Sequence, residues 1–138
     1  MSGPSARPER RSARAGLILA ALAGLALAVI GVRFLISPDA AARFFGVGSR
    51  PPGIELHSVV GIRDLWLGML AVGFAALRDY RALALWLALG AIVCVADALV
   101  VMSATGKASA IAFHLASGVF CIVGGGLCWR SYRRTTPK

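Results

Sequence analysis

Four long apolar stretches, separated by short polar segments and flanked by arginines, take up most of this 138-residue chain. Each stretch holds about 20 residues, the length that an α-helix needs to cross the roughly 30 Å hydrocarbon core of a bilayer. Hydrophobic residues make up 58% of the chain and charged residues only 15%, whereas soluble domains hold about 45–50% and about 25%. The sequence therefore predicts an integral membrane protein with an all-α fold, whose first partner is the lipid bilayer.

The pattern predicts one transmembrane domain at residues 15–129, between two basic tails. The first tail, residues 1–14, carries too few apolar side chains to order itself, so we expect it to be disordered and cytoplasmic. The second basic cytoplasmic tail is expected at 130–138. The expected spans are 15–36, 54–77, 82–102 and 108–129. Because short loops make consecutive helices antiparallel neighbours, the expected architecture is a four-helix transmembrane bundle.

A short interfacial helix is expected after the first span. Ser37 can cap its start and Pro38 suits its first position, since proline lacks only an N–H that would be unpaired there. Gly46 can end it. Phe44 and Phe45 would then reach into the headgroup boundary.

The basic residues predict the orientation of the chain. If both ends are cytoplasmic, ten basic residues lie inside and three outside, which satisfies the positive-inside rule. The inside set is Arg7, Arg10, Arg11, Arg14, Arg78, Arg81, Arg130, Arg133, Arg134 and Lys138, and the outside set is Arg43, Arg50 and Lys107. The net charge of +9 is thus explained by topology, and we expect no nucleic-acid partner. Abundant Arg, Ala and Gly are typical of a bacterial source, which predicts the inner cell membrane.

Ionisable residues inside the spans are the candidate functional residues. A charge at the centre of a span costs about 2.5–3.5 kcal/mol, so such residues generally face the interior of the bundle. Helical spacing groups polar and small residues on one face of each of the last three spans. These faces carry His57, Gly61, Asp64 and Gly68 in the second span, Gly90, Cys94 and Asp97 in the third, and His114, Gly118, Cys121, Gly125 and Cys128 in the fourth. Small residues at such spacing let membrane helices approach closely. We therefore expect Asp97, His114 and Asp64 to converge, with Arg63 or Glu55 as further members and His57 nearer the hydrated interface.

Other chemistries find little support in these residues. His57, Asp64, Asp97 and His114 offer metal-binding atoms but no close-spaced pair, so no metal is expected. No phosphate loop, dinucleotide fingerprint or nucleophile elbow is present in the sequence, and no cofactor is expected. The cysteines form no Cys-x-x-Cys pair, and Cys121 and Cys128 lie too far apart along one helix for a disulfide.

The chain resembles the domain-of-unknown-function family 4267 of small four-span membrane proteins, and is distantly similar to DoxX-like membrane proteins. The resemblance rests on Ser37-Pro38, Phe45-Gly46, Gly61-Ile62-Arg63-Asp64, Gly68, Asp97 and His114, and it covers about residues 24–129. It implies the four-span fold and a set of positions, namely Arg63, Asp64, Asp97 and His114, but no reaction.

Three functions remain open from the sequence. The polar cluster can bind a lipophilic molecule such as a quinone, a sterol-like compound or a lipid. It can instead serve an intramembrane acid/base enzyme, with His114 or Asp97 moving a proton and Arg63 stabilising negative charge. The third function is structural. An ion pair between Arg63 and a carboxylate and a hydrogen bond from His114 to Asp97 would then only hold the helices in register, in a subunit of a larger membrane complex or in a homo-oligomer.

Overall fold

The computed structural model describes residues 6–47 and 54–135, with side chains described for 11–47 and 56–135. The described residues form helices and short connections, without a strand. The helices are α1 (Ala6–Ile36), α2 (Pro38–Phe45), α3 (Ile54–Ala76), α4 (Tyr80–Ala104) and α5 (Ala108–Thr135). The prediction of an all-α fold with a short helix after the first span is confirmed.

Four of these helices are long and apolar enough to cross a membrane. The qualifying segments are Arg11–Ile36, Leu56–Ala76, Tyr80–Ala104 and Ala108–Thr135. Large apolar side chains such as Ile92 and Ile122 are exposed on the outside of the bundle, which suits a protein surrounded by acyl chains. The chain is a multi-pass membrane protein.

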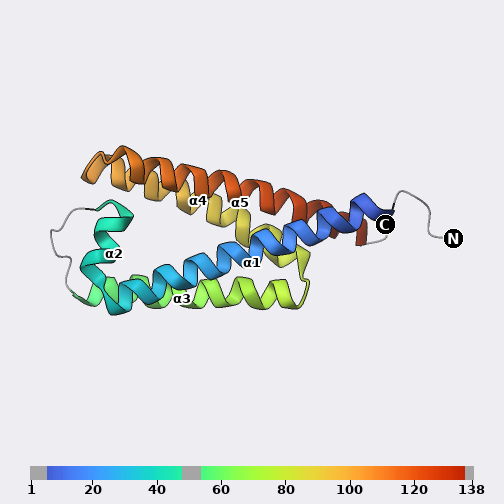
Figure 1. Cartoon of the computed structure of the whole chain (residues 1–138), viewed down its shortest axis with the longest axis horizontal. Coiled ribbons are helices and arrows are strands. Elements are labelled where there is room, and N and C mark those ends of the chain that lie inside the picture. Colours follow the sequence, from blue (N-terminus) through green and yellow to red (C-terminus); the bar gives the residue numbers. More distant parts are fainter. Residues whose placement is uncertain (1–5, 48–53, 136–138) are drawn as a thin grey trace.

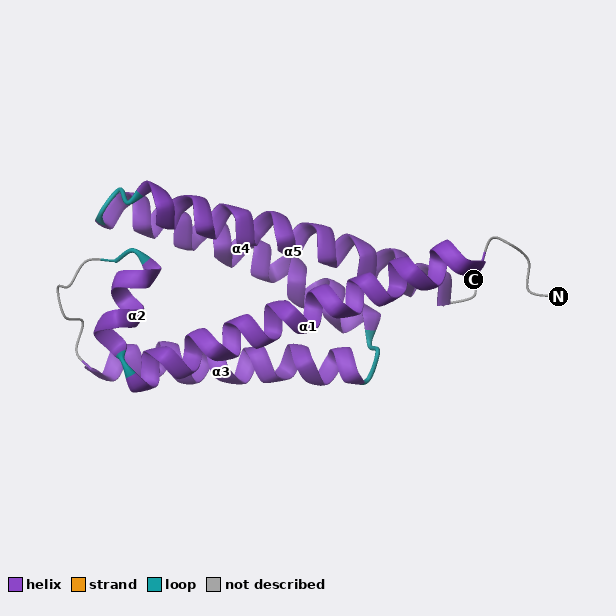
Figure 2. Ribbon diagram, in the orientation of Figure 1, coloured by secondary structure: helices purple, strands orange, loops and turns teal. Residues whose placement is uncertain are grey.

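The four long helices form two antiparallel pairs (Figures 1 and 2). Helix α1 packs along α3, and α4 packs along α5. The pairs meet through α1 and α5 at the end of the bundle where α1 begins and α5 ends, here called the tail end. They diverge toward the opposite end, the α2 end, where α2 lies between them (Figure 2).

Glycines on both helices hold α1 against α3. A Cβ on Gly31 would lie 2.5 Å from the Leu65 nitrogen and 2.6 Å from the Gly61 oxygen. A Cβ on Gly68 would lie 2.5 Å from the Gly24 oxygen. Because the two backbones touch at these positions, no larger side chain fits there. The prediction that small residues mark the helix interfaces is confirmed for Gly61 and Gly68.

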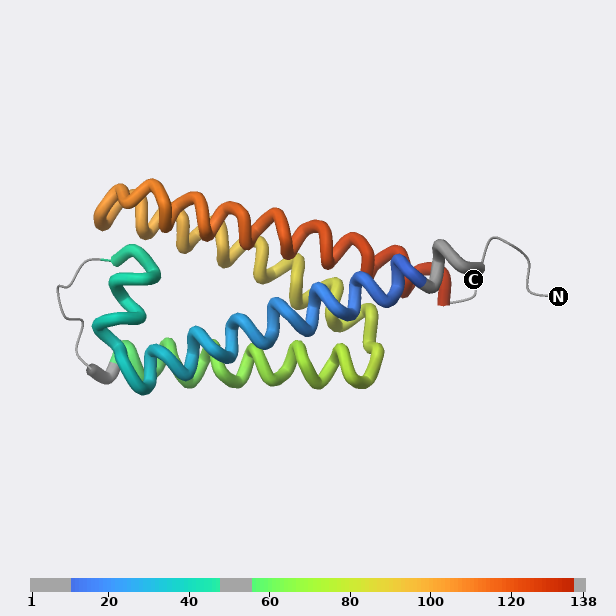
Figure 3. Tube along the Cα trace, in the orientation of Figure 1, coloured from blue at the N-terminus to red at the C-terminus, as the bar shows by residue number. Residues whose placement is uncertain are grey.

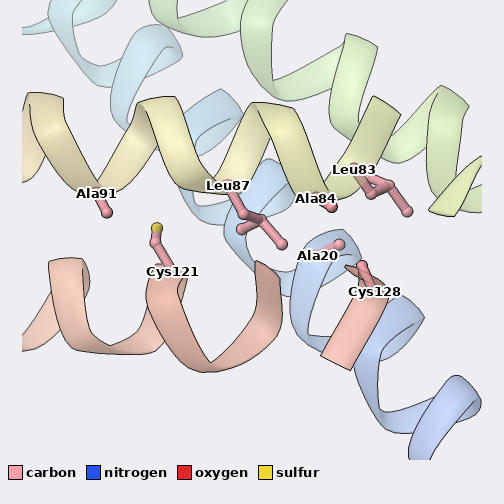
Figure 4. Packing of buried hydrophobic residues seen from close by; sticks show 7 residues of the cluster. All are labelled: Ala20, Leu83, Ala84, Leu87, Ala91, Cys121 and Cys128. Carbon is pink, nitrogen blue, oxygen red and sulfur yellow. The ribbon is translucent and has the colours of Figure 1, made fainter. Parts of the chain in front are cut away.

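The apolar core lies where α1 meets the α4–α5 pair, toward the tail end (Figure 4). Leu83 and Leu87 of α4 are fully buried there, against Ala20 of α1 and Cys128 of α5. Gly125 of α5 leaves room for this packing, since a Cβ on it would lie 3.4 Å from the Leu87 Cβ. This core joins the two pairs, whereas the α2 end depends on other contacts.

The first and last helices extend further than expected at the tail end: Figure 1 shows the start of α1 there, and Figure 3 shows the end of α5. Helix α1 begins at Ala6 and α5 continues to Thr135, so the prediction of disorder across residues 1–14 is wrong for 6–14, and residues 1–5 lie outside the described part. Arg, Ala and Glu favour helix, and Pro8 falls in the first turn, where proline is tolerated. At 1.5 Å per residue the 31 residues of α1 span about 47 Å, so its arginine-rich turns extend beyond a roughly 30 Å hydrocarbon core.

Candidate functional site

Three ionisable residues lie in the α2-end half of the bundle, each on a different helix. Asp97 precedes the end of α4 by seven residues, His114 follows the start of α5 by six, and Asp64 follows the start of α3 by ten. These positions correspond to depths of about 10, 9 and 15 Å from the helix ends. The site therefore lies where the two helix pairs diverge.

On α3, Arg63 and Asp64 form an ion pair. The Arg63 Nε donates to Asp64 Oδ1 at 2.9 Å, and the Arg63 side chain is 51% exposed while that of Asp64 is 6% exposed. Asp64 shares the face of α3 that carries Gly61 and Gly68 against α1. The buried carboxylate thus has a charged partner, as buried charges require.

Asp97 differs from Asp64 because it has no such partner. Its side chain is half-buried on α4, and it makes neither a hydrogen bond nor an ion pair with any residue in the described part of the chain. It does interact electrostatically with His114, Arg63 and Asp64. Asp97 is thus linked to Arg63, Asp64 and His114 by charge alone, and the convergence of these residues on one site stays a prediction.

His114 is buried on α5 and points toward α2. Its Nε2 lies 3.0 Å from the Phe45 carbonyl oxygen, and its ring centroid lies 4.5 Å from that of Phe45. Since a carbonyl only accepts, Nε2 carries the hydrogen and donates. The hydrogen bond from His114 to Asp97 considered from the sequence is not formed, and the single N–H of the neutral ring donates to Phe45 instead.

His57 lies in an aromatic cluster near the start of α3. Its buried ring stacks on Phe34 at 6.0 Å, and Phe34 in turn meets Phe45 edge-on at 6.3 Å. His57 lies three residues after the start of α3, and its position near the hydrated interface stays a prediction. Phe45 is half-buried, whereas Phe44 is exposed.

Helix α2 is fixed to the α4–α5 turn by two hydrogen bonds. The Thr105 hydroxyl donates to the Gly46 oxygen at 2.6 Å, and Lys107 Nζ donates to the Arg43 oxygen at 3.3 Å. Gly46 ends α2 in the left-handed conformation, with φ of 100°, which glycine adopts without strain. Ser37 precedes Pro38 as expected, but its side chain makes no capping bond.

The remaining predicted residue, Glu55, belongs to α3, but its side chain lies outside the described part of the chain. Among the described residues, no group of three or more His, Cys, Asp or Glu is arranged to hold a metal ion.

One pair of residues was missed by the sequence analysis. Cys94 of α4 and Cys121 of α5 lie on the facing sides of their helices, because a Cβ on Gly90 would lie 3.7 Å from the Cys121 sulfur and a Cβ on Gly118 would lie 3.4 Å from the Cys94 Cβ. The sequence predicts each cysteine on a glycine-containing face of its own helix, but it does not show that the two faces meet. The signal was the matching pattern of Gly90 and Cys94 on one helix and Gly118 and Cys121 on the next.

Comparison with known proteins gives a family match. The model of a domain of unknown function, DUF4267, matches residues 24–128, which include Arg63, Asp64, Asp97 and His114. No curated protein and no solved structure matches the chain. The distant similarity to DoxX-like proteins stays a prediction.

Proposed function

This chain belongs to the DUF4267 family, and we propose that it binds a lipophilic molecule whose polar head contacts Asp97, His114 and Arg63. The observation that carries the proposal is the half-buried Asp97 carboxylate, which lacks a bonded partner among the described residues. A charged side chain within a bilayer costs about 2.5–3.5 kcal/mol on insertion scales, and such residues generally have a partner. A bound ligand would supply one.

The surrounding groups suggest the chemistry of the polar head. An ionised Asp97 only accepts hydrogen bonds, whereas the half-exposed Arg63 guanidinium only donates them. A head that both donates and accepts, such as a hydroxyl or a quinol, would satisfy both. The apolar body of the ligand would then lie between the helix pairs or against the exposed apolar side chains in the bilayer.

Acid/base catalysis on such a ligand is the second candidate function. Because His114 donates from Nε2 to Phe45, its Nδ1 is free to accept a proton when the ring is neutral. Asp97, in electrostatic contact with His114, could exchange that proton, and Arg63 could stabilise a developing negative charge. The binding function does not require this step.

The location follows from the same proposal. We place the protein in a bacterial inner membrane with both ends cytoplasmic, so that the site opens toward the outer leaflet. The ten-to-three distribution of basic residues supports this orientation. A second copy or another membrane protein as partner remains a prediction.

The test is the set of lipids and small molecules that stay with the protein through gentle purification. Mass spectrometry would compare wild type with Asp97→Asn and with Asp39→Asn, a matched control because Asp39 is an exposed aspartate on α2. We expect a specific molecule in wild type and Asp39→Asn that is lost from Asp97→Asn. If all three proteins retain the same molecules, the proposal is wrong.

A further inference from the structure

Cys94 and Cys121 form a thiol pair across the α4–α5 interface. Cys94 is half-buried and Cys121 is buried, and the two helices that carry them pack along each other. In Figure 4 the Cys121 sulfur points from α5 toward α4, next to Ala91. The two thiols therefore come from different helices and belong to the same interface.

Small residues bring the two helices close at this point. A Cβ on Gly118 would lie 3.4 Å from the Cys94 Cβ, and a Cβ on Gly90 would lie 3.7 Å from the Cys121 sulfur. A disulfide needs Cβ atoms about 3.5–4.5 Å apart, which only closely packed helices can provide. The close approach of α4 and α5 beside both cysteines supports an S–S bond between them.

The third cysteine provides an internal contrast. Cys128 is fully buried and faces α1, where its sulfur would lie 3.2 Å from a Cβ on Gly16. It lies seven residues beyond Cys121 on the same helix, about 10 Å away along the axis. Cys128 therefore has no cysteine partner in the described part of the chain.

Asp97 connects the thiol pair to the candidate site. It follows Cys94 by three residues, which places both on one face of α4, and it interacts electrostatically with Cys94. A carboxylate one helical turn from a thiol can accept the thiol proton when the thiol is oxidised.

We propose that Cys94 and Cys121 are a redox pair that a membrane-soluble quinone, bound at Asp97, oxidises to an interhelical disulfide. The inference rests on the proposed function and names its ligand class. The quinone class follows from the electron count and from the surroundings: a dithiol releases two electrons and two protons, and the acceptor must dissolve in the bilayer.

The reaction balances without a further reactant. The two S–H bonds break and one S–S bond forms. The two electrons and two protons reduce both quinone carbonyls to the hydroxyls of the quinol, with Asp97 relaying protons from the thiols. The quinol can then diffuse away in the bilayer.

The experiment uses the full chain in lipid nanodiscs, with duroquinone as the probe because its fully methylated ring disfavours thiol addition. The readouts are intact mass, alkylation of free thiols, peptide mapping of the disulfide and the yield of quinol. The variants are Cys94→Ser, Cys121→Ser, Asp97→Asn and, as the control, Cys128→Ser. Copper phenanthroline, which oxidises neighbouring thiols without the quinone site, is applied in parallel.

We expect one Cys94–Cys121 disulfide and one quinol per chain in wild type and in Cys128→Ser, and neither in the other two cysteine variants. Asp97→Asn should react with duroquinone about a hundredfold more slowly, the lower end of the range for a lost general base, but reach the same extent with copper phenanthroline.

Every other outcome contradicts a specific part of the proposal. If copper phenanthroline forms no disulfide in wild type, the thiols are not neighbours, and the inference fails whatever ligand the protein retains. If copper phenanthroline forms the disulfide but duroquinone does not, the proposed quinone reaction is wrong. Ligand binding at Asp97 is then tested separately, by mass spectrometry of the molecules that the purified protein retains. If Asp97→Asn reacts as fast as wild type, the thiol pair stands and the site proposed at Asp97 fails.

Discussion

His114 of α5 donates a hydrogen bond from Nε2 to the main-chain carbonyl of Phe45, at 3.0 Å, and the two rings pack 4.5 Å apart. Phe45 is the last residue of α2, so this contact fixes the end of the short helix to the α4–α5 pair. It also fixes the orientation of the imidazole, whose second nitrogen remains for Asp97 or a ligand.

Replacing His114 should therefore loosen α2. We expect His114→Ala to leave the Phe45 carbonyl without its donor and to lower the free energy of unfolding by about 1–3 kcal/mol, the cost of an unsatisfied buried polar group. Hydrogen exchange would show faster exchange at the Gly46 and Val47 amides, which bond to Ala42 in the native protein. His114→Gln, which can donate from its amide, should retain more protection; equal losses in both variants would contradict the bond's role.

The glycine contacts between α1 and α3 make a second prediction. Gly31→Ala should push α1 from α3, because the new Cβ would meet the Leu65 nitrogen at 2.5 Å and the Gly61 oxygen at 2.6 Å, atoms that cannot turn aside. Overpacking of this kind costs about 1–3 kcal/mol. Thermal unfolding in detergent should show the loss as a lower midpoint.

The chain offers matched controls for that substitution. A Cβ on Gly73 of α3 or on Gly126 of α5 would meet nothing within 4 Å. Gly73→Ala and Gly126→Ala should leave the midpoint unchanged or raise it, since alanine favours helix over glycine by roughly 1 kcal/mol. A drop at Gly73 as large as that at Gly31 would show that close packing is not the cause.

The two aspartates should respond in opposite directions to loss of charge. Asp64→Asn removes the partner of Arg63 and should lower stability by about 1–2 kcal/mol, less than a fully buried pair would lose because the Arg63 side chain is 51% exposed. In protein freed of bound ligand, Asp97→Asn removes a charge that has no bonded partner among the described residues, so it should leave the unfolding midpoint unchanged or raise it. Parallel melting curves measure both. A larger drop for Asp97→Asn than for Asp64→Asn would favour a role in helix register.

Hydropathy and capping residues predicted much of this fold from the sequence. The length of the apolar runs indicated four spans, Ser37-Pro38 marked the start of α2, and Gly46 marked its end. These features are local, because each depends on a few neighbouring residues. Helix ends were less predictable: α1 and α5 extend beyond their apolar runs, since arginine and alanine sustain a helix in the absence of a breaking residue.

The candidate site was predictable only in part, for a physical reason. Helical periodicity indicates which residues share a face, and it grouped Cys94 with Asp97 and His114 with Cys121. It does not determine how two helices rotate and slide against each other, so the facing of Cys94 and Cys121 was missed. Nor does it show main-chain atoms of other elements, which is why His114 was paired with Asp97 and not with the Phe45 carbonyl.

The orientation of the bundle can be measured with single introduced cysteines. In a chain whose native cysteines are replaced by serine, Ser109→Cys and Thr135→Cys place exposed thiols at opposite ends of α5. Because the basic residues at the tail end should remain cytoplasmic, a membrane-impermeant maleimide added to intact cells should label the cysteine at 109 and spare that at 135. Both should label after lysis, which controls for accessibility. If only the cysteine at 135 is labelled in intact cells, the protein has the opposite orientation, and the site around Asp97 lies in the cytoplasmic leaflet.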